Sequence, residues 1–256
     1  MGIQLSETDR AAYGRDGFLV VSDLLAPAEV AALRARVREY THGDRPRDGI
    51  VFQTEPRVQR GELSVTHLGD GIRKIERLVE HDDLFRNLGL HPHIVGIITT
   101  LLGPDLKIFR NALLLKPPDV GSQKGWHQDS PYWPIEPMDL CSCWFPLDDA
   151  TLENGCMVVL PGGHRRGPLP HLRVPDDFVM DPACFAEEDG VACPMKAGSG
   201  LFFHSLLPHY TATNRSDRWR RAIALSYMGS RSRYTGQSEG PVYFPVQGET
   251  FPGCVR

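Results

Sequence analysis

The sequence lacks the features that mark nucleic-acid-binding and membrane-spanning proteins. Its net charge is −4, and apart from the Arg-rich stretch 215–221 it contains no cluster of basic residues. Nucleic acid is not an expected partner, because neutralising phosphates requires clustered Lys and Arg. No apolar run approaches the roughly 20 residues that a membrane-spanning helix needs. We therefore expect no nucleic acid and no membrane among the partners.

Paired cysteine motifs are also missing. The six cysteines include no CxxC pair, and no secretory signal is recognisable. Disulfides are rare in reducing compartments, so free thiols and a cytoplasmic location are expected. Cys141 and Cys143 stand two residues apart on a predicted strand, which leaves a structural zinc site as a less favoured alternative.

What the sequence does contain is typical of one globular domain over residues 1–256. Apolar residues make up 41% and charged residues 23% of the chain, enough for a substantial core. Residues 1–102 show helical patterns. Ser6 with Asp9 predicts a capped helix, Pro27 suits the first turn of an amphipathic helix, and helical spacing runs from Ile72 to Leu102 with a break at Pro92. Short strands are expected at 18–21 and 51–53. The polar segment 41–71 is either a binding loop or a solvated surface loop.

After Gly103 the pattern changes to short β runs separated by Gly and Pro. These runs are 108–109, 113–115, 139–146, 157–160, 201–203 and 222–228. Many short strands without regular helices between them favour a closed antiparallel architecture. We therefore predict a mostly β fold with N-terminal and flanking helices, a double-stranded β-helix (jelly roll, cupin-like). Helical support would occupy about 1–102 and the jelly-roll core about 103–235.

His127 and Asp129 are the first candidates for metal ligands. Residues two apart on a strand point to the same side, so an imidazole and a carboxylate can reach one ion. A third ligand would come from His204 or His209. Two His and one carboxylate form the facial triad of non-haem Fe(II) oxygenases, which leaves positions for a chelating co-substrate and dioxygen. The same ligands also suit zinc.

Arg220 lies eleven residues beyond His209, on the next predicted strand. An α-keto acid chelating the metal needs a cation for its far carboxylate, and the planar guanidinium binds carboxylates in bidentate fashion. This spacing favours His209 over His204 as the third ligand. On an alternating strand, Arg221 should face the opposite way.

These motifs, in this order, resemble the phytanoyl-CoA dioxygenase family of Fe(II)/2-oxoglutarate-dependent oxygenases. The resemblance spans nearly the whole chain. It rests on segments 17–20, 29–33, 84–86, 116–118, 126–129, 153–156, 160–164 and 214–221.

The resemblance implies a set of roles for individual residues. Fe(II) would be held by His127, Asp129 and His209, which are also the catalytic centre. The co-substrate 2-oxoglutarate would contact Arg220 at its distal carboxylate, with help from Lys74, Trp144, Gln128 and Thr211. With O2, such an enzyme hydroxylates or otherwise oxidises an unactivated C–H bond of a small-molecule substrate and releases succinate and CO2. Related halogenases have a small residue in place of Asp129, so its presence argues against halogenation.

Several alternatives stay open from the sequence. The chain could be a catalytically inactive cupin-like metal-binding or regulatory protein, or a zinc hydrolase, although no HExxH motif supports the latter. Tyr132 and Trp133 either form a wall of the substrate pocket or cover the barrel mouth. A group of polar and basic residues either selects an anionic substrate or faces solvent: Gln53, Arg57, Arg60, Arg231 and Arg233. The protein is expected to be a monomer or a homodimer.

Overall fold

The computed structural model describes residues 2–256 of the chain. Its helices are α1 (Glu7–Asp16), α2 (Pro27–His42), α3 (Pro56–Gln59), α4 (Leu78–His81), α5 (Asp83–Gly89) and α6 (Pro92–Leu102). Five short 3-10 segments are η1 (Leu68–Gly71), η2 (Ser130–Tyr132), η3 (Gly163–Arg166), η4 (Pro182–Cys184) and η5 (Glu187–Asp189). None of the helices in this part of the chain is long and apolar enough to cross a bilayer.

The strands form antiparallel sheets, as the prediction of a jelly roll requires. They are β1 (Phe18–Val21), β2 (Val51–Thr54), β3 (Ile72–Glu76), β4 (Leu106–Lys116), β5 (Lys124–His127), β6 (Ile135–Glu136), β7 (Cys141–Pro146), β8 (Met157–Val159), β9 (His171–Val174), β10 (Asp177–Met180), β11 (Val191–Cys193), β12 (Gly200–His204), β13 (His209–Thr211), β14 (Arg220–Gly229), β15 (Arg233–Tyr234) and β16 (Phe244–Gln247).

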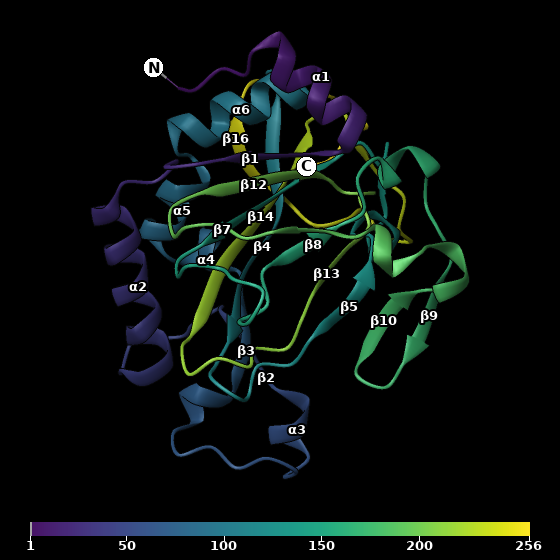
Figure 1. Cartoon of the computed structure of the whole chain (residues 1–256). Helices are drawn as coiled ribbons and strands as arrows, with labels where there is room; N and C mark the ends of the chain where they lie inside the picture. Colours follow the sequence, from purple (N-terminus) through teal and green to yellow (C-terminus); the bar gives the residue numbers. More distant parts are fainter. Residues whose placement is uncertain (1) are drawn as a thin grey trace.

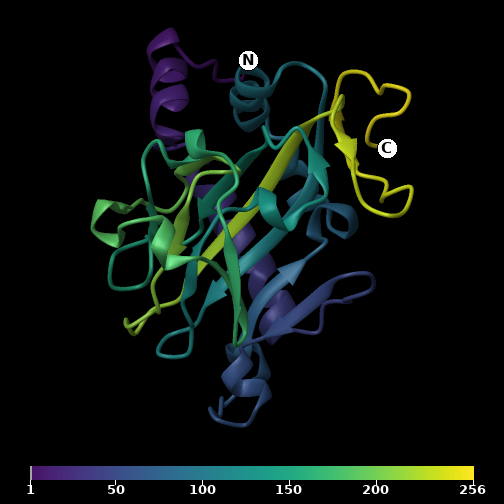
Figure 2. The same ribbon diagram turned by 90° about the vertical axis from the view of Figure 1, so that its right-hand side faces the viewer.

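Two sheets define the architecture. The large sheet has the order β1-β12-β7-β14-β4-β3-β2, with β16 paired to β4, and the small sheet has the order β11-β8-β13-β5. Helix α2 runs along one side of the molecule, α1 and α6 lie at one end, and the β9–β10 hairpin projects on the side of the small sheet (Figure 1). The C-terminal segment lies on the side away from α1 (Figure 2). The fold is a double-stranded β-helix with flanking helices, as predicted.

Alternation along the central strands separates a helix-facing side from an inner side. On β7, Cys141, Cys143 and Phe145 pack in the core with the helices, whereas Trp144 packs in a second cluster with residues of the small sheet. On β14, Ile223 and Leu225 belong to the first cluster. Side chains on a strand alternate between its two faces. The residues between these positions therefore face inward, between the sheets.

The N-terminal part departs from the predicted helical support. Residues Ile72–Glu76 form strand β3 instead of starting a helix, because pairing with β2 and β4 overrides the three-residue spacing of Ile72 and Ile75. Strand β16 also lies beyond residue 235 and joins the large sheet. The elements on both sides of the predicted core thus contribute strands to it.

Other local predictions are confirmed. Ser6 and Asp9 form a capping box at α1, and Pro27 and Pro92 begin α2 and α6. The predicted runs 108–109 and 113–115 belong to one strand, β4. All six cysteines are free, and Cys141 and Cys143 are buried among apolar side chains, which gives no support to the zinc alternative for that pair.

Candidate metal and co-substrate site

His127 and His209 lie opposite each other on neighbouring strands of the small sheet. His127 ends β5, His209 begins β13, and the two residues are direct partners in the antiparallel register. Their ring centroids are 4.1 Å apart. The strand pairing, which no local sequence pattern reveals, brings the two imidazoles together.

Both imidazoles are held in one orientation by the backbone. Nδ1 of His127 bonds to the carbonyl of Gly125 at 2.8 Å, and Nδ1 of His209 bonds to the carbonyl of Leu207 at 2.9 Å. These carbonyls accept, so each Nδ1 carries the proton and each Nε2 keeps its lone pair. Burial holds the pKa of His127 well below its usual value and also lowers the pKa of His209. Neutral imidazoles with a free Nε2 are the form that binds metals.

Asp129 completes the cluster, although it does not lie on the strand. Strand β5 ends at His127, and Asp129 has helical backbone angles at the start of η2. The prediction that both residues point to one side is confirmed, but the period-two argument for it is wrong. Oδ1 of Asp129 lies 3.8 Å from Nε2 of His127 and 4.0 Å from Nε2 of His209. The potential ligand atoms all lie within 4.8 Å of one another.

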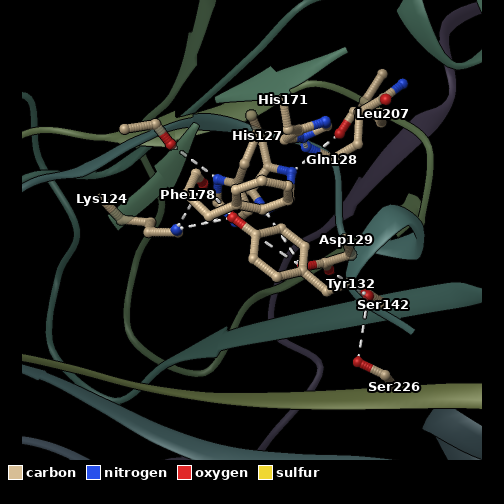
Figure 3. Close-up of polar contacts among 12 residues, drawn as sticks. Lys124, His127, Gln128, Asp129, Tyr132, Ser142, His171, Phe178, Leu207 and Ser226 are labelled. Atoms are coloured by element: carbon tan, nitrogen blue, oxygen red, sulfur yellow. Dashed lines mark hydrogen bonds and ion pairs between the residues drawn. The ribbon is translucent and has the colours of Figure 1, made fainter. Parts of the chain in front are cut away.

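The other oxygen of Asp129 is fixed by the large sheet. Ser142 on β7 donates a hydrogen bond to Oδ2 at 2.8 Å, and the Ser142 hydroxyl lies 3.2 Å from that of Ser226 on β14 (Figure 3). Neither serine was among the predicted site residues. A hint lay in the sequence, since Ser142 is a polar residue between two core cysteines.

His204, the rival third ligand, lies outside the cluster. It ends β12, where its Nε2 lies 3.3 Å from Asp139 and its Nδ1 accepts a hydrogen bond from the backbone of Leu206. Phe203 precedes it and packs on the ring of His209. The geometry therefore agrees with the choice of His209.

A cavity of about 420 Å³ opens beside the three residues, between the two sheets. Its lining includes Arg220 and Trp144, which are 2% and 1% exposed. The guanidinium of Arg220 lies over the Trp144 ring at 5.4 Å. Within residues 2–256, Nε and Nη1 of Arg220 and Nε1 of Trp144 have no hydrogen-bond partner. Buried donors without partners are rare, and these three border the cavity.

The surroundings of Arg220 explain its state. Burial lowers its pKa to about 10, which still leaves the guanidinium charged near neutral pH. Arg221 faces the other way, as predicted, and donates to both carboxylate oxygens of Asp148 at 2.7 Å. Arg220 therefore lines the cavity, whereas the neighbouring Arg221 is paired with Asp148 on the other face of the strand.

Lys74 and Thr211 also line this cavity. Lys74 is carried by β3 and already pairs with Glu76 at 2.8 Å. Burial and the nearby Arg110 lower the pKa of Lys74. The structure therefore brings four of the five predicted co-substrate residues to one cavity, with Lys74 shared between that cavity and an acid.

Gln128 is the exception and needs correction. Its side chain is completely buried, does not line the cavity, and forms hydrogen bonds with the surrounding backbone. Nε2 donates to the carbonyls of Gly167 and Leu206 at 2.9 and 2.8 Å, and Oε1 accepts from the N–H of Leu169 at 2.7 Å. Gln128 lies between two residues that face the site, and its side chain points to the other side. It anchors the ligand segment and does not face the co-substrate.

Two arginines of the cavity were missed in the sequence. Arg73 and Arg110 both line it, and so does Gln53 from the group suggested to select an anion. Arg60 of that group pairs with Glu62 and Asp176, and Arg231 lies over Phe251. Alternation along the full length of β4 puts Arg110 on the same face as Leu114 and Lys116, which line the cavity too.

Comparison with known proteins agrees with this geometry. The sequence profile described as phytanoyl-CoA dioxygenase (PhyH) matches residues 13–222. The chain belongs to the PhyH family. Among curated relatives of this PhyH protein, peroxisomal phytanoyl-CoA dioxygenase of Rattus norvegicus is 29% identical over 241 residues, covering 90% of this chain and 70% of the relative. Ectoine dioxygenase of Bordetella parapertussis is 29% identical over 238 residues, covering 85% and 73%.

Solved structures extend the similarity to the fold and the cofactors. EctD from S. alaskensis with bound Fe is 25% identical, with a TM-score of 0.75, covering 98% of this chain and 87% of that chain. The non-heme alpha ketoglutarate dependent carbocyclase SnoK from nogalamycin biosynthesis is also 25% identical, with a TM-score of 0.71 and coverages of 96% and 94%.

This PhyH-family protein is an Fe(II)- and 2-oxoglutarate-dependent dioxygenase. The predicted use of iron, 2-oxoglutarate and O2 is confirmed. Membership of the family gives no support to an inactive cupin-like protein or to a zinc hydrolase.

Proposed function

We propose that the protein hydroxylates, or otherwise oxidises, an unactivated C–H bond of a small-molecule substrate and releases succinate and CO2. One domain formed by residues 1–256 would carry this activity, as a monomer or a homodimer. The observation that carries the proposal is the convergence of three potential ligand atoms beside a cavity that contains unpaired buried donors.

His127, Asp129 and His209 would hold Fe(II) through Nε2, Oδ1 and Nε2. Two neutral imidazoles and one carboxylate suit this ion. Each ligand also forms a hydrogen bond through the atom that does not face the cluster, and this bond fixes its orientation. When bound, Fe(II) and 2-oxoglutarate would supply the electrons that activate O2 for oxidation of the substrate. The retained carboxylate of Asp129 supports an oxygen-derived oxidation over halogenation.

Arg220 would bind the distal carboxylate of 2-oxoglutarate. Its two unpartnered nitrogens offer a charge-assisted contact, and the indole N–H of Trp144 offers another donor nearby. Thr211 and Lys74 would line the same path. Enclosure by Trp144 and Phe203 keeps water away from the charged groups.

The decisive test is binding of the co-substrate to the iron-loaded protein without oxygen. Fe(II) and 2-oxoglutarate together should produce a weak visible charge-transfer band, and admitting O2 should release succinate. Absence of the band in a folded, iron-loaded sample would sink the assignment. Binding of 2-oxoglutarate without succinate release across a broad set of small molecules would favour the inactive alternative. Hydrolysis supported by zinc alone would favour the hydrolase.

Light scattering after size-exclusion chromatography would distinguish the monomer from the homodimer.

A further inference from the structure

The cavity has two ends that carry different chemistry. On β14, Arg220 pairs with Lys116 of β4, whereas Ser226 pairs with Arg110. The Arg220–Lys116 pair and the Ser226–Arg110 pair are six residues apart along the extended strand, which corresponds to roughly 20 Å. Arg220 therefore marks one end, and Arg110 marks the other.

The candidate ligands lie near the level of Arg110. Ser142 is the partner of Ser226 on β7 and holds Asp129, whereas Trp144 pairs with Ala224, closer to Arg220. A co-substrate that reaches from Asp129 to Arg220 passes Trp144 and Ala224, which both line the cavity. The end that contains Arg110 is left for the primary substrate.

Arg110 is a half-buried cation without an acidic partner. Its guanidinium lies 5.7 Å from the centroid of the Trp133 ring, and that ring packs edge-on against Phe109 at 4.6 Å. Among the described residues, no carboxylate forms an ion pair or hydrogen bond with Arg110. By contrast, Lys74 pairs with Glu76 and Lys124 pairs with Asp177. Trp133 restrains a guanidinium that is free to bind an anion.

The charge of the whole cavity points the same way. Six basic side chains and three acidic ones line it, and burial holds the pKa of one of the six, Lys116, well below its usual value. Fe(II) and the dianion of 2-oxoglutarate cancel each other's charge, so their binding leaves this excess unchanged. A cleft lined by one sign of charge concentrates ligands of the opposite sign. Around Arg110 the lining includes the Trp133 ring and the hydroxyl groups of Ser142 and Ser226.

We propose that the primary substrate is a small acid whose oxyanion group, a carboxylate or a phosphoryl group, binds Arg110 at the end of the cavity away from Arg220. The inference rests on the proposed function, because it assigns the substrate class of that same site. It makes Arg110 a specificity-determining residue. Trp133 positions Arg110 by packing on its guanidinium.

The test uses the protein loaded with Fe(II) and saturating 2-oxoglutarate under anaerobic conditions. Benzoate, phenylphosphonate and benzamide are titrated by calorimetry while the charge-transfer band is followed. The three probes share one ring, and only benzamide is neutral. At least one acid should bind at least about tenfold more tightly than benzamide, a difference of about 1.4 kcal/mol. Preference for benzoate identifies a carboxylate site, and preference for phenylphosphonate identifies a phosphoryl site.

Two variants separate a specific contact from a general field. Arg110→Gln should weaken binding of the preferred acid about tenfold, whereas Arg73→Gln removes the same charge from another part of the cavity and should have a smaller effect. Equal binding of all three probes, or equal losses in the two variants, would overturn the proposal. So would displacement of 2-oxoglutarate by the acid, seen as loss of the band. Failure of the proposed function is distinguishable, because the band is then absent before any probe is added.

Discussion

Ser142 donates a hydrogen bond to Oδ2 of Asp129 at 2.8 Å, and this contact leaves Oδ1 facing the Nε2 atoms of His127 and His209. The carboxylate therefore offers one oxygen to the candidate metal site and the other to the large sheet. The two imidazoles belong to the small sheet, so the contact links a residue of the ligand cluster to the large sheet.

Replacing Ser142 by Ala should weaken iron binding by about 10- to 100-fold, as loss of a partner that orients a ligand does in other metal sites. Titration of the metal-free protein with Fe(II) under anaerobic conditions measures the effect. Ser226→Ala is the matched control. Its hydroxyl contacts Ser142 and not Asp129, so a smaller change is expected. Equal affinity of Ser142→Ala and wild type would contradict the role assigned to this contact.

His209→Ala and Asp129→Ala should each abolish succinate production, because each removes one of three candidate iron ligands. His204→Ala is the control, since His204 is directed at Asp139 and lies outside the ligand cluster. It should retain iron and activity. Bound iron and released succinate are measured together. If His204→Ala is inactive while His209→Ala remains active, the choice of third ligand is wrong.

Arg220→Leu should raise the 2-oxoglutarate concentration needed for half-maximal turnover by about 10- to 100-fold. A hydrogen bond to a charged group contributes about 1.5–3 kcal/mol, and Nε and Nη1 of the buried guanidinium have no hydrogen-bond partner among residues 2–256. Arg218→Leu removes a nearby arginine whose side chain is 77% exposed, and should leave the requirement unchanged. Similar values for Arg220→Leu and wild type would assign the distal carboxylate to a neighbouring residue.

Asp82 provides a stability prediction away from the site. Its buried carboxylate accepts hydrogen bonds from Arg36, Tyr40 and the backbone of Leu84, joining α2 to α5. Burial alone would raise the pKa of Asp82, but the bonds from Arg36, Tyr40 and Leu84 outweigh it and lower that pKa. Asp82→Asn should reduce the free energy of unfolding by about 3 kcal/mol at pH 7, since it breaks a buried ion pair.

The pH dependence of this effect follows from the direction of the shift. A lowered folded-state pKa stabilises the protein above the unfolded value of about 3.9. That stabilisation is lost as the pH falls through the folded-state pKa of Asp82. Urea unfolding at pH 7 and at decreasing pH should show the wild type and Asp82→Asn converging. The control Glu39→Gln removes a half-exposed partner of Arg36 and should have little effect. A pH-independent difference between Asp82→Asn and wild type would contradict the assignment to ionisation.

Most residues of the candidate site could be predicted from the sequence, because their chemistry and spacing mark them. His127, Asp129, His209 and Arg220 stand in the order and spacing of a known family, and strand pairing places His127 opposite His209. Strand β3 was missed because its residues have helical spacing, and only pairing with β2 and β4 makes them a strand. Interactions between distant segments cannot be read from local periodicity.

Gln128 and Arg110 are two further residues whose place in the structure the sequence did not predict. The family resemblance placed Gln128 at the co-substrate, whereas its side chain forms hydrogen bonds with the backbone of Gly167 and Leu169. For Arg110, alternation along β4 was informative only after the full length of that strand was known. The two shorter strands expected at 108–109 and 113–115 left Arg110 in a loop.

The unpartnered nitrogens of Arg220 also affect the stability of the folded protein before the co-substrate binds. A buried donor without a partner destabilises the folded state by about 1–3 kcal/mol, and apolar replacements of buried charges are often neutral or stabilising. In the absence of co-substrate, Arg220→Leu should therefore resist urea at least as well as the wild type. At a concentration of 2-oxoglutarate that saturates the wild type, the wild type should gain more resistance than the variant. Arg220 thus lowers the free energy of unfolding of the protein without co-substrate and contributes to a higher free energy of unfolding once the co-substrate is bound.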